Sequence, residues 1–358
     1  MDKKISALTE NEGVSLPETT SNSAAQKIKL SRAKQHSVEA FVTNILAGDI
    51  PFLSRAITLV ESTTVKHQQK ANAILERCLP FANNSVRIGI TGVPGVGKST
   101  FIEAFGKHLT SQGKKVAVLA VDPSSSLNKG SILGDKTRME SLSMRDDVFI
   151  RPTATGKTLG GVAQHTRETI ILCEAAGYDI IFIETVGVGQ SETVVHSMVD
   201  FFLLLMLSGA GDELQGIKRG IMEMADALSI TKADGDNLIK SKTAVGDYKH
   251  AIHLFPAKKN NWIPKVLTCS ALENTGVQEI WNTIESFVKH CVTNGTFESA
   301  RKKQAQYWLH ESIQEQLGTY FYENPEVKVL LPELEKRVLE GNLSPFIGAN
   351  QLIDLFKK

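Results

Sequence analysis

The chain has 358 residues, 42% of them hydrophobic, which is enough for one large domain with helical additions around a buried core. Its 40 Lys and Arg residues nearly balance 39 Asp and Glu, and a net charge of +1 gives no support to binding of nucleic acid or of an anionic membrane. The four cysteines lie far apart without a Cys-x-x-Cys pair, which is typical of reduced thiols in a cytoplasmic protein. The longest apolar run, residues 201–207, has seven residues. A membrane span needs about 20, so this run predicts a buried parallel strand.

The first 83 residues divide into two parts. Residues 1–35 are polar and carry neither an apolar nor an Arg-rich targeting signal, so we expect a disordered leader. Residues 36–83 are expected to form an N-terminal helical region, because Phe41 and Ile45 share one helical face and the Gly-Asp-Ile-Pro sequence at 48–51 interrupts the pattern. We expect these helices to pack against the domain that follows.

The clearest motif lies at residues 86–105. Apolar residues alternate from Val86 to Ile90 and predict a strand, residues 92–99 match Gly-x-x-x-x-Gly-Lys-Ser, and apolar residues then recur at helical spacing. This strand–loop–helix order is the context of a phosphate-binding P-loop. We therefore expect the following residues to bind phosphates: Gly92, Val93, Pro94, Gly95, Val96, Gly97, Lys98, Ser99 and Thr100.

Two side chains of the P-loop have distinct expected roles. Lys98 is expected to reach the β- and γ-phosphates and to act in hydrolysis, and the Ser99 hydroxyl is placed to ligate Mg²⁺. Glycines let backbone N–H groups approach phosphate oxygens, and the following helix adds its N-terminal partial charge.

Acidic residues follow the next buried strands. Asp122 follows the predicted strand Val116–Val121, and Asp135 lies in a loop before a short predicted strand at 149–151. Glu184 follows a predicted strand at 178–183. Ligands of such sheets bind at the carboxyl ends of the strands, so Asp122 is expected to point into the site. Glu184 and the glycines after it are similar to a Walker B and γ-phosphate-sensing loop. Glu184 is therefore expected to hold Mg²⁺ through water or to act on the attacking water, the alternative being a carboxylate that only caps the strand end.

A second pair of motifs predicts the base. The strand Ala227–Ile230 is followed by Thr-Lys-Ala-Asp, similar to the guanine-reading Asn-Lys-x-Asp motif, and a strand at 266–268 is followed by Ser-Ala-Leu. An Asp in this position accepts hydrogen bonds from the guanine N1–H and exocyclic amine, which adenine does not offer there. The bound nucleotides are therefore expected to be GTP and GDP, contacted by Thr231, Lys232, Asp234, Ser270, Ala271 and Leu272.

The predicted fold is α/β: a P-loop NTPase with a mostly parallel central sheet flanked by helices, at residues 84–290. Residues 291–358 read as amphipathic helices with exposed aromatic area, and we expect them to form a C-terminal helical dimerisation region of a homodimer. The alternative is that these helices only cover their own core.

With these motifs together, the chain resembles the MeaB/ArgK/MMAA family within the SIMIBI class of P-loop GTPases, over about residues 36–350. The resemblance rests on Asp49 with Ala-Ile-Thr-Leu-Val-Glu-Ser at 56–62, the P-loop, Val-Asp-Pro-Ser-Ser at 121–125, Thr-Leu-Gly-Gly-Val-Ala at 158–163, Glu-Thr-Val-Gly-Val-Gly-Gln-Ser-Glu at 184–192, and Ser-Gly-Ala-Gly-Asp-Glu-Leu-Gln-Gly-Ile-Lys-Arg-Gly at 208–220. The last stretch is the most discriminating. Thr231 in place of the usual Asn and Lys157 before Leu159 are departures from the family pattern.

The resemblance implies a GTP-hydrolysing chaperone of an adenosylcobalamin-dependent acyl-CoA mutase, typically methylmalonyl-CoA mutase. It implies that Asp122, Asp135 and Glu184 serve Mg²⁺ and hydrolysis and that Gly187 belongs to the nucleotide-binding set. It further implies that Asp212, Gln215 and Lys218 lie in a switch that reports the nucleotide state to the mutase. Cobalamin is expected on the partner, since no Cys or His here looks like its ligand.

Two other classes of protein remain open. A metal-insertion GTPase of the nickel metallochaperone type would need a Cys/His cluster, which the sequence lacks. A kinase linked to amino-acid transport would need a substrate pocket beyond the P-loop.

Overall fold

The central sheet is fully parallel. The computed structural model describes residues 36–121, 139–152, 159–185, 191–209 and 219–357. Within them, seven strands form one sheet in the order β3-β2-β4-β1-β5-β6-β7. In chain order the strands are β1 Val86–Gly92, β2 Val116–Val121, β3 Val148–Pro152, β4 Ile180–Thr185, β5 Phe201–Met206, β6 Ala227–Ile230 and β7 Lys265–Thr268. Each strand lies where the residue pattern predicts one, and the α/β fold class is confirmed.

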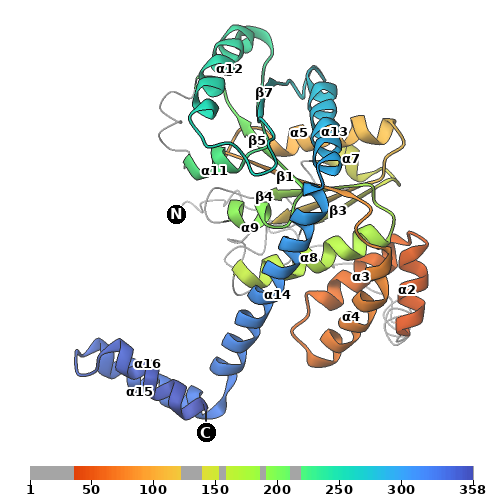
Figure 1. Cartoon of the computed structure of the whole chain (residues 1–358). Helices are drawn as coiled ribbons and strands as arrows, with labels where there is room; N and C mark the ends of the chain where they lie inside the picture. The colour runs from red at the N-terminus through yellow and green to blue at the C-terminus, as the bar shows by residue number, and fades with distance from the viewer. Residues whose placement is uncertain (1–35, 122–138, 153–158, 186–190, 210–218, 358) are drawn as a thin grey trace, which may run out of the picture.

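Helices cover both faces of the sheet (Figure 1). One face packs against the elements α2 Val38–Leu46, α3 Ile50–Val60, α4 Val65–Cys78, α8 Leu159–Ala175, α9 Ser191–His196, α11 Arg219–Met224 and α12 Leu238–His253. The other face packs against α5 Lys98–Ser111, α7 Glu140–Ser143 and α13 Val277–Thr293. The near-continuous apolar sequences of the strands are thereby buried on both sides, as parallel sheets require.

The N-terminal helices form as predicted, and local signals explain their limits. Gly48 takes a φ of +78° after α2, and the Asp49 carboxylate accepts a hydrogen bond from the Phe52 N–H at 2.8 Å, which caps the start of α3. At the far end of α3, Glu61 pairs with Arg151 of β3 at 2.5 Å. This ion pair joins the helical region to the carboxyl end of an outer strand.

The C-terminal residues form helices that leave the sheet. Helix α14, Thr296–Glu323, starts beside the sheet and runs outward to a hairpin of α15, Pro325–Leu339, and α16, Pro345–Phe356 (Figure 1). The hairpin has a small core of its own around Val327, Leu334 and Leu352. The predicted domain boundary at residue 290 falls inside α13. The division into domains stays a prediction.

The ends of several strands differ from the predicted positions, among them those of β4 and β5. β4 begins two residues later and ends two residues later than its apolar run, because Glu184 and Thr185 keep pairing with Ala120 and Val121 of β2. β5 ends at Met206, one residue earlier than its apolar run. Glu184 therefore lies within β4 rather than beyond it. No helix in the described part of the chain is both long and apolar enough to cross a membrane.

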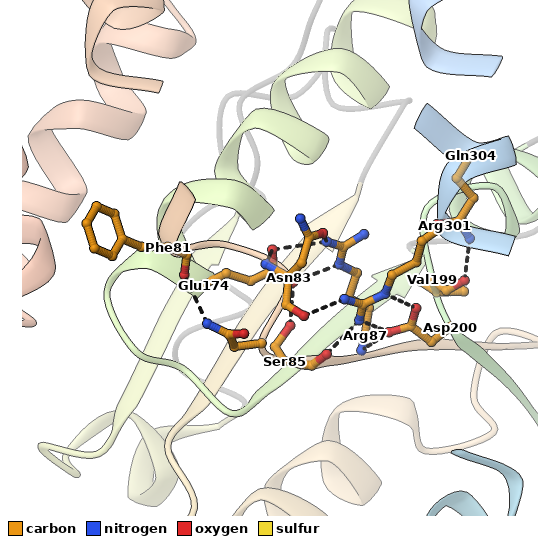
Figure 2. Close-up of polar contacts among 10 residues, drawn as sticks. Phe81, Asn83, Ser85, Arg87, Glu174, Val199, Asp200, Arg301 and Gln304 are labelled. Carbon is orange, nitrogen blue, oxygen red and sulfur yellow. Dashed lines mark hydrogen bonds and ion pairs between the residues drawn. The ribbon is translucent and has the colours of Figure 1, made fainter. Parts of the chain in front are cut away.

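At the amino ends of the strands, charged side chains form a buried network (Figure 2). Arg87 of β1 pairs with Glu174 of α8 at 2.8 Å, and Arg301 of α14 pairs with Asp200 at 2.6 Å. Arg301 also donates to the backbone carbonyl of Ser85 at 2.6 Å. The first turns of α14 are therefore attached to the sheet at the amino ends of its strands, opposite the P-loop.

Candidate nucleotide-binding site

The loop between β1 and α5 has the shape of a phosphate cradle. A Cβ atom on Gly92 would lie 2.5 Å from the carbonyl oxygen of Leu205, so only glycine fits at the end of β1. Gly97 takes a φ of +93° and precedes α5, and no side chain caps that helix. The first N–H groups of α5 are thus not satisfied by a cap, which is the arrangement that helices use to bind phosphate.

Lys98 is folded over this loop. Its Nζ donates to the carbonyl oxygens of Gly92, at 2.8 Å, and Val93, at 3.4 Å. Burial lowers the pKa of Lys98, while the carboxylates of Glu184 and Glu192 act in the opposite direction. A phosphate placed at the loop would favour the charged form of Lys98 in the same way as these carboxylates.

Glu184 and the adjacent threonines lie beside the cradle. Glu184 of β4 is in register with Ile90 of β1 and is only 4% exposed. One residue further along each strand, the hydroxyl groups of Thr91 and Thr185 lie 2.8 Å apart in the interior. The described part of the site therefore combines an ammonium group, a buried carboxylate and hydroxyl groups at one end of the sheet.

The residues after β6 are joined directly to the P-loop. The Thr231 hydroxyl lies 2.7 Å from the Val96 carbonyl oxygen and donates a hydrogen bond to it, and the Lys232 Nζ donates to the Gly95 carbonyl oxygen at 2.8 Å. Thr231, which stands where the usual motif has Asn, therefore supplies a hydrogen-bond donor to the P-loop through its hydroxyl. The motif alone did not indicate this bond.

The two predicted base-binding motifs also meet. The Ser270 hydroxyl donates to the Asp234 carboxylate, and the Ala233 N–H donates to the Cys269 carbonyl oxygen at 3.1 Å. Ala271 is half-buried, whereas Leu272 is 82% exposed. The ends of β6 and β7 therefore form one surface next to the P-loop.

Some predicted site residues lie outside the described part of the chain. These are Asp122, Asp135, Gly187, Asp212, Gln215 and Lys218. Within the described part, no group of three or more His, Cys, Asp or Glu side chains is arranged to hold a metal ion.

Sequence reasoning missed two residues next to the base-binding motif. Asn237 donates through Nδ2 to the Lys232 carbonyl oxygen at 2.7 Å and accepts a hydrogen bond from the Ser208 hydroxyl at 2.6 Å. Ser208 is 29 residues away in sequence and begins the family stretch 208–220, which gave no sign of a contact with the base-binding motif, and Asn237 belongs to no motif. Only their contact in the fold identifies them.

The comparisons with known proteins agree with this geometry. Residues 53–326 match the family described as methylmalonyl Co-A mutase-associated GTPase MeaB. The chain is 47% identical to a probable GTPase of Mycobacterium tuberculosis over 319 residues, covering 89% of this chain and 95% of the relative. It is 44% identical to the mitochondrial methylmalonic aciduria type A homolog of Mus musculus over 338 residues, covering 92% and 81%.

One further relative is named only as a GTPase, and one similar solved structure is named as a kinase. The GTPase ArgK of Escherichia coli is 44% identical over 316 residues, covering 88% of this chain and 96% of that protein. A crystal structure described as LAO/AO transport system kinase superposes with a TM-score of 0.71 at 38% identity, covering 90% of this chain and 98% of the other.

Proposed function

Because this chain belongs to the MeaB family of GTPases, we propose that it is a Mg²⁺-dependent GTPase that acts in the cytoplasm as a chaperone of an adenosylcobalamin-dependent acyl-CoA mutase of the methylmalonyl-CoA mutase type. GTP binding and hydrolysis would be coupled to cofactor loading and to protection of the mutase. The observation that carries the GTPase chemistry is the junction of the P-loop with Thr231 and Lys232. The mutase is supported by the family description and by the name of the mouse relative.

The proposed chemistry begins with the phosphates. Lys98 exchanges the carbonyl oxygens of Gly92 and Val93 for β- and γ-phosphate oxygens and stabilises the charge that develops on the γ-phosphate. Water attacks the γ-phosphorus, the bond to the β–γ bridging oxygen breaks, and GDP and inorganic phosphate leave. Glu184, buried beside Lys98, orients the water or holds a metal-bound water.

The donor set fits Mg²⁺, a hard cation that prefers oxygen ligands. The Ser99 hydroxyl and the Glu184 carboxylate are the oxygen donors of the proposed set that lie in the described part of the chain. Asp122 and Asp135, which lie outside it, would complete the set. When bound, Mg²⁺ would neutralise charge between the β- and γ-phosphates.

The base would lie between the two motifs that follow β6 and β7. Asp234 would accept hydrogen bonds from the guanine N1–H and amine, with Lys232 along one face of the base and Ser270, Ala271 and Leu272 closing over it. The Ser270 hydroxyl already orients the Asp234 carboxylate, which supports this role.

A homodimer is the proposed assembly. Four apolar residues of α14 recur on one side of the helix and are exposed, at 60% for Leu309, 45% for Ile313, 59% for Leu317 and 72% for Tyr320. Exposed apolar stripes of this length are typical of surfaces between protein chains. Light scattering should give twice the chain mass at micromolar concentration, and a monomer with and without GDP would exclude the dimer.

The decisive experiment on the mutase measures GTP turnover with and without purified methylmalonyl-CoA mutase. We propose that Asp212, Gln215 and Lys218 report the nucleotide state to it. Replacing Gln215 and Lys218 together by Ala should leave the basal rate within a few-fold of wild type. It should remove most of the acceleration, which is of order tenfold to a hundredfold for a coupling of ~1–3 kcal/mol. Equal loss of both rates would assign these residues to hydrolysis, and no acceleration of wild type would exclude the mutase as a partner.

A kinase is the alternative favoured by the name of the structural neighbour. Release of the γ-phosphate as inorganic phosphate in stoichiometric amounts supports the GTPase. Transfer to a co-purified protein or small molecule would support the kinase.

A further inference from the structure

Ser208 and Asn237 join three segments at the proposed base site. Ser208 follows β5, Asn237 precedes α12, and Lys232 belongs to the loop after β6. The Ser208 hydroxyl donates to Asn237 Oδ1 at 2.6 Å, and Asn237 Nδ2 donates to the Lys232 carbonyl oxygen at 2.7 Å. Both polar atoms of the amide are therefore used.

The backbone at Lys232 needs such support. Its φ is +54°, in the left-handed region that costs a residue with a side chain free energy. The Nζ of Lys232 is held by the Gly95 carbonyl oxygen at 2.8 Å, and its own carbonyl is held by Asn237. Contacts at both ends of the residue thus maintain a backbone conformation that the isolated chain would rarely adopt.

Asn237 also contacts the loop through its backbone. Its N–H donates to the Asp234 carbonyl oxygen at 2.9 Å, so Asn237 contacts both Lys232 and Asp234, the two residues proposed to face the base. The Lys232 carbonyl oxygen can only accept, so Nδ2 must face it; Oδ1 then faces the Ser208 hydroxyl, which donates to it and holds the amide in place. Asn237 is half-buried, and the preceding Asp236 is exposed.

We propose that Asn237, held in place by Ser208, is a positioning residue that sets the preference of this chain for guanine. It acts through Lys232 and Asp234, and it has no contact with the P-loop backbone in the bonds described. The proposal rests on the base site assigned above. Loss of the bond from Asn237 to Lys232 lets the backbone of Lys232 relax from its left-handed conformation. Asp234 then moves away from the edge of the guanine, while phosphate binding remains.

The test compares dissociation constants for GDP, inosine diphosphate and ADP by calorimetry. Asn237→Asp keeps the size of the side chain and its bond from Ser208 but removes the donor to Lys232. We expect its GDP constant to rise by about three- to tenfold, the weight of one net hydrogen bond, with the ADP constant unchanged. Inosine diphosphate lacks the exocyclic amine, so its constant should rise less than that of GDP.

Two further variants separate the two bonds. Ser208→Ala should shift the GDP constant in the same direction by about two- to threefold, because Oδ1 loses the hydroxyl that holds the amide in place while Nδ2 still donates to Lys232. Asp236→Ala is the matched control in the same turn and should bind like wild type. For Asn237→Asp, the KM for GTP should rise while kcat stays within twofold, a split that a loss of folding would not produce.

The outcomes distinguish the possibilities. Equal weakening of GDP and ADP, or an unchanged preference in Asn237→Asp at wild-type thermal stability, would overturn the role of Asn237. Asp234→Ala serves as the reference for the base site. If it leaves the guanine preference intact, the base assignment fails, whereas an effect of Asp234→Ala without one of Asn237→Asp refutes only the positioning role.

Discussion

Around β1, the two ends of the sheet are held mainly by different kinds of bond. At the carboxyl ends, side chains donate to backbone carbonyl oxygens: Lys98 to Gly92 and Thr231 to Val96. At the amino ends, charged side chains pair with each other, Arg87 with Glu174 and Arg301 with Asp200 (Figure 2).

The charged end is deeply buried. The side chains of Arg87 and Glu174 are 3% and 0% exposed, and a serine hydroxyl and a backbone N–H complete the shell of the carboxylate. Burial, together with the neighbouring charge of Arg87, lowers the pKa of Arg167 on α8 to about 10. Removing one member of such a cluster leaves the other charge buried without its partner, which is costly.

We expect the hydrogen bonds at the carboxyl ends to exchange acceptors when a ligand binds, and the ion pairs at the amino ends to remain. A phosphate can replace a backbone carbonyl as the acceptor of Lys98, because the bond lost has a net free energy of only about 1.5–3 kcal/mol and the bond to phosphate replaces it. The ion pairs at the other end hold the first turns of α14 against the sheet. Ligand-dependent change is therefore expected at the carboxyl ends, with the C-terminal helices fixed at the amino ends.

The largest effect should come from Lys98→Ala. This change removes the ammonium group proposed to face the γ-phosphate, and kcat for GTP should fall by about 10³-fold or more. Thermal unfolding should stay close to wild type, since the two bonds it loses are to backbone carbonyls of its own loop. Near-normal turnover would refute the P-loop assignment.

Glu174→Ala should act on stability instead of hydrolysis. It strands Arg87 in the interior and should lower the free energy of unfolding by about 3–5 kcal/mol, measured by urea denaturation. Glu39→Ala removes an exposed partner of Arg77 and should be indistinguishable from wild type. If the change in KM for GTP of folded Glu174→Ala, expressed as a free energy, is as large as its loss of stability, the two ends of the sheet are coupled.

Thr231→Val tests the link between the base loop and the P-loop. Valine keeps the shape but loses the donor to Val96, so GDP should bind about threefold to tenfold more weakly. Thr231→Ser retains a hydroxyl and should bind GDP like wild type. Equal affinities of the Val and Ser variants, in calorimetric titration, would show that the bond has no part in binding.

The smallest effect concerns pH. Although burial acts in the opposite direction, the bonds from Arg87 and Ser85 and from the Asn83 backbone hold the pKa of Glu174 below its usual 4.5. The folded state thus binds a proton less readily, and the stability that this carboxylate contributes is present above pH 4.5 and lost as pH falls further. The gap in unfolding free energy between wild type and Glu174→Gln should shrink from pH 6 to pH 3. A gap independent of pH would contradict the ionised pair.

Much of the fold follows from patterns within short windows. The seven strands and the P-loop were predicted because apolar runs and glycine spacing are local properties of the chain. The end of β4 was misplaced because Glu184 and Thr185 are polar, and pairing with the neighbouring strands keeps them in β4.

The sequence alone was enough to predict which segments become strands and helices, which loop has the pattern of a P-loop and which family the chain resembles. Local backbone preferences and burial patterns are sufficient for these. The tertiary structure decided how distant polar groups are satisfied: Thr231 at the Val96 carbonyl, Asn237 between Ser208 and Lys232, and Glu174 beside Arg87. A buried donor or acceptor requires a partner, but any segment that the fold brings near can supply it. The identity of that partner is therefore a property of the folded chain.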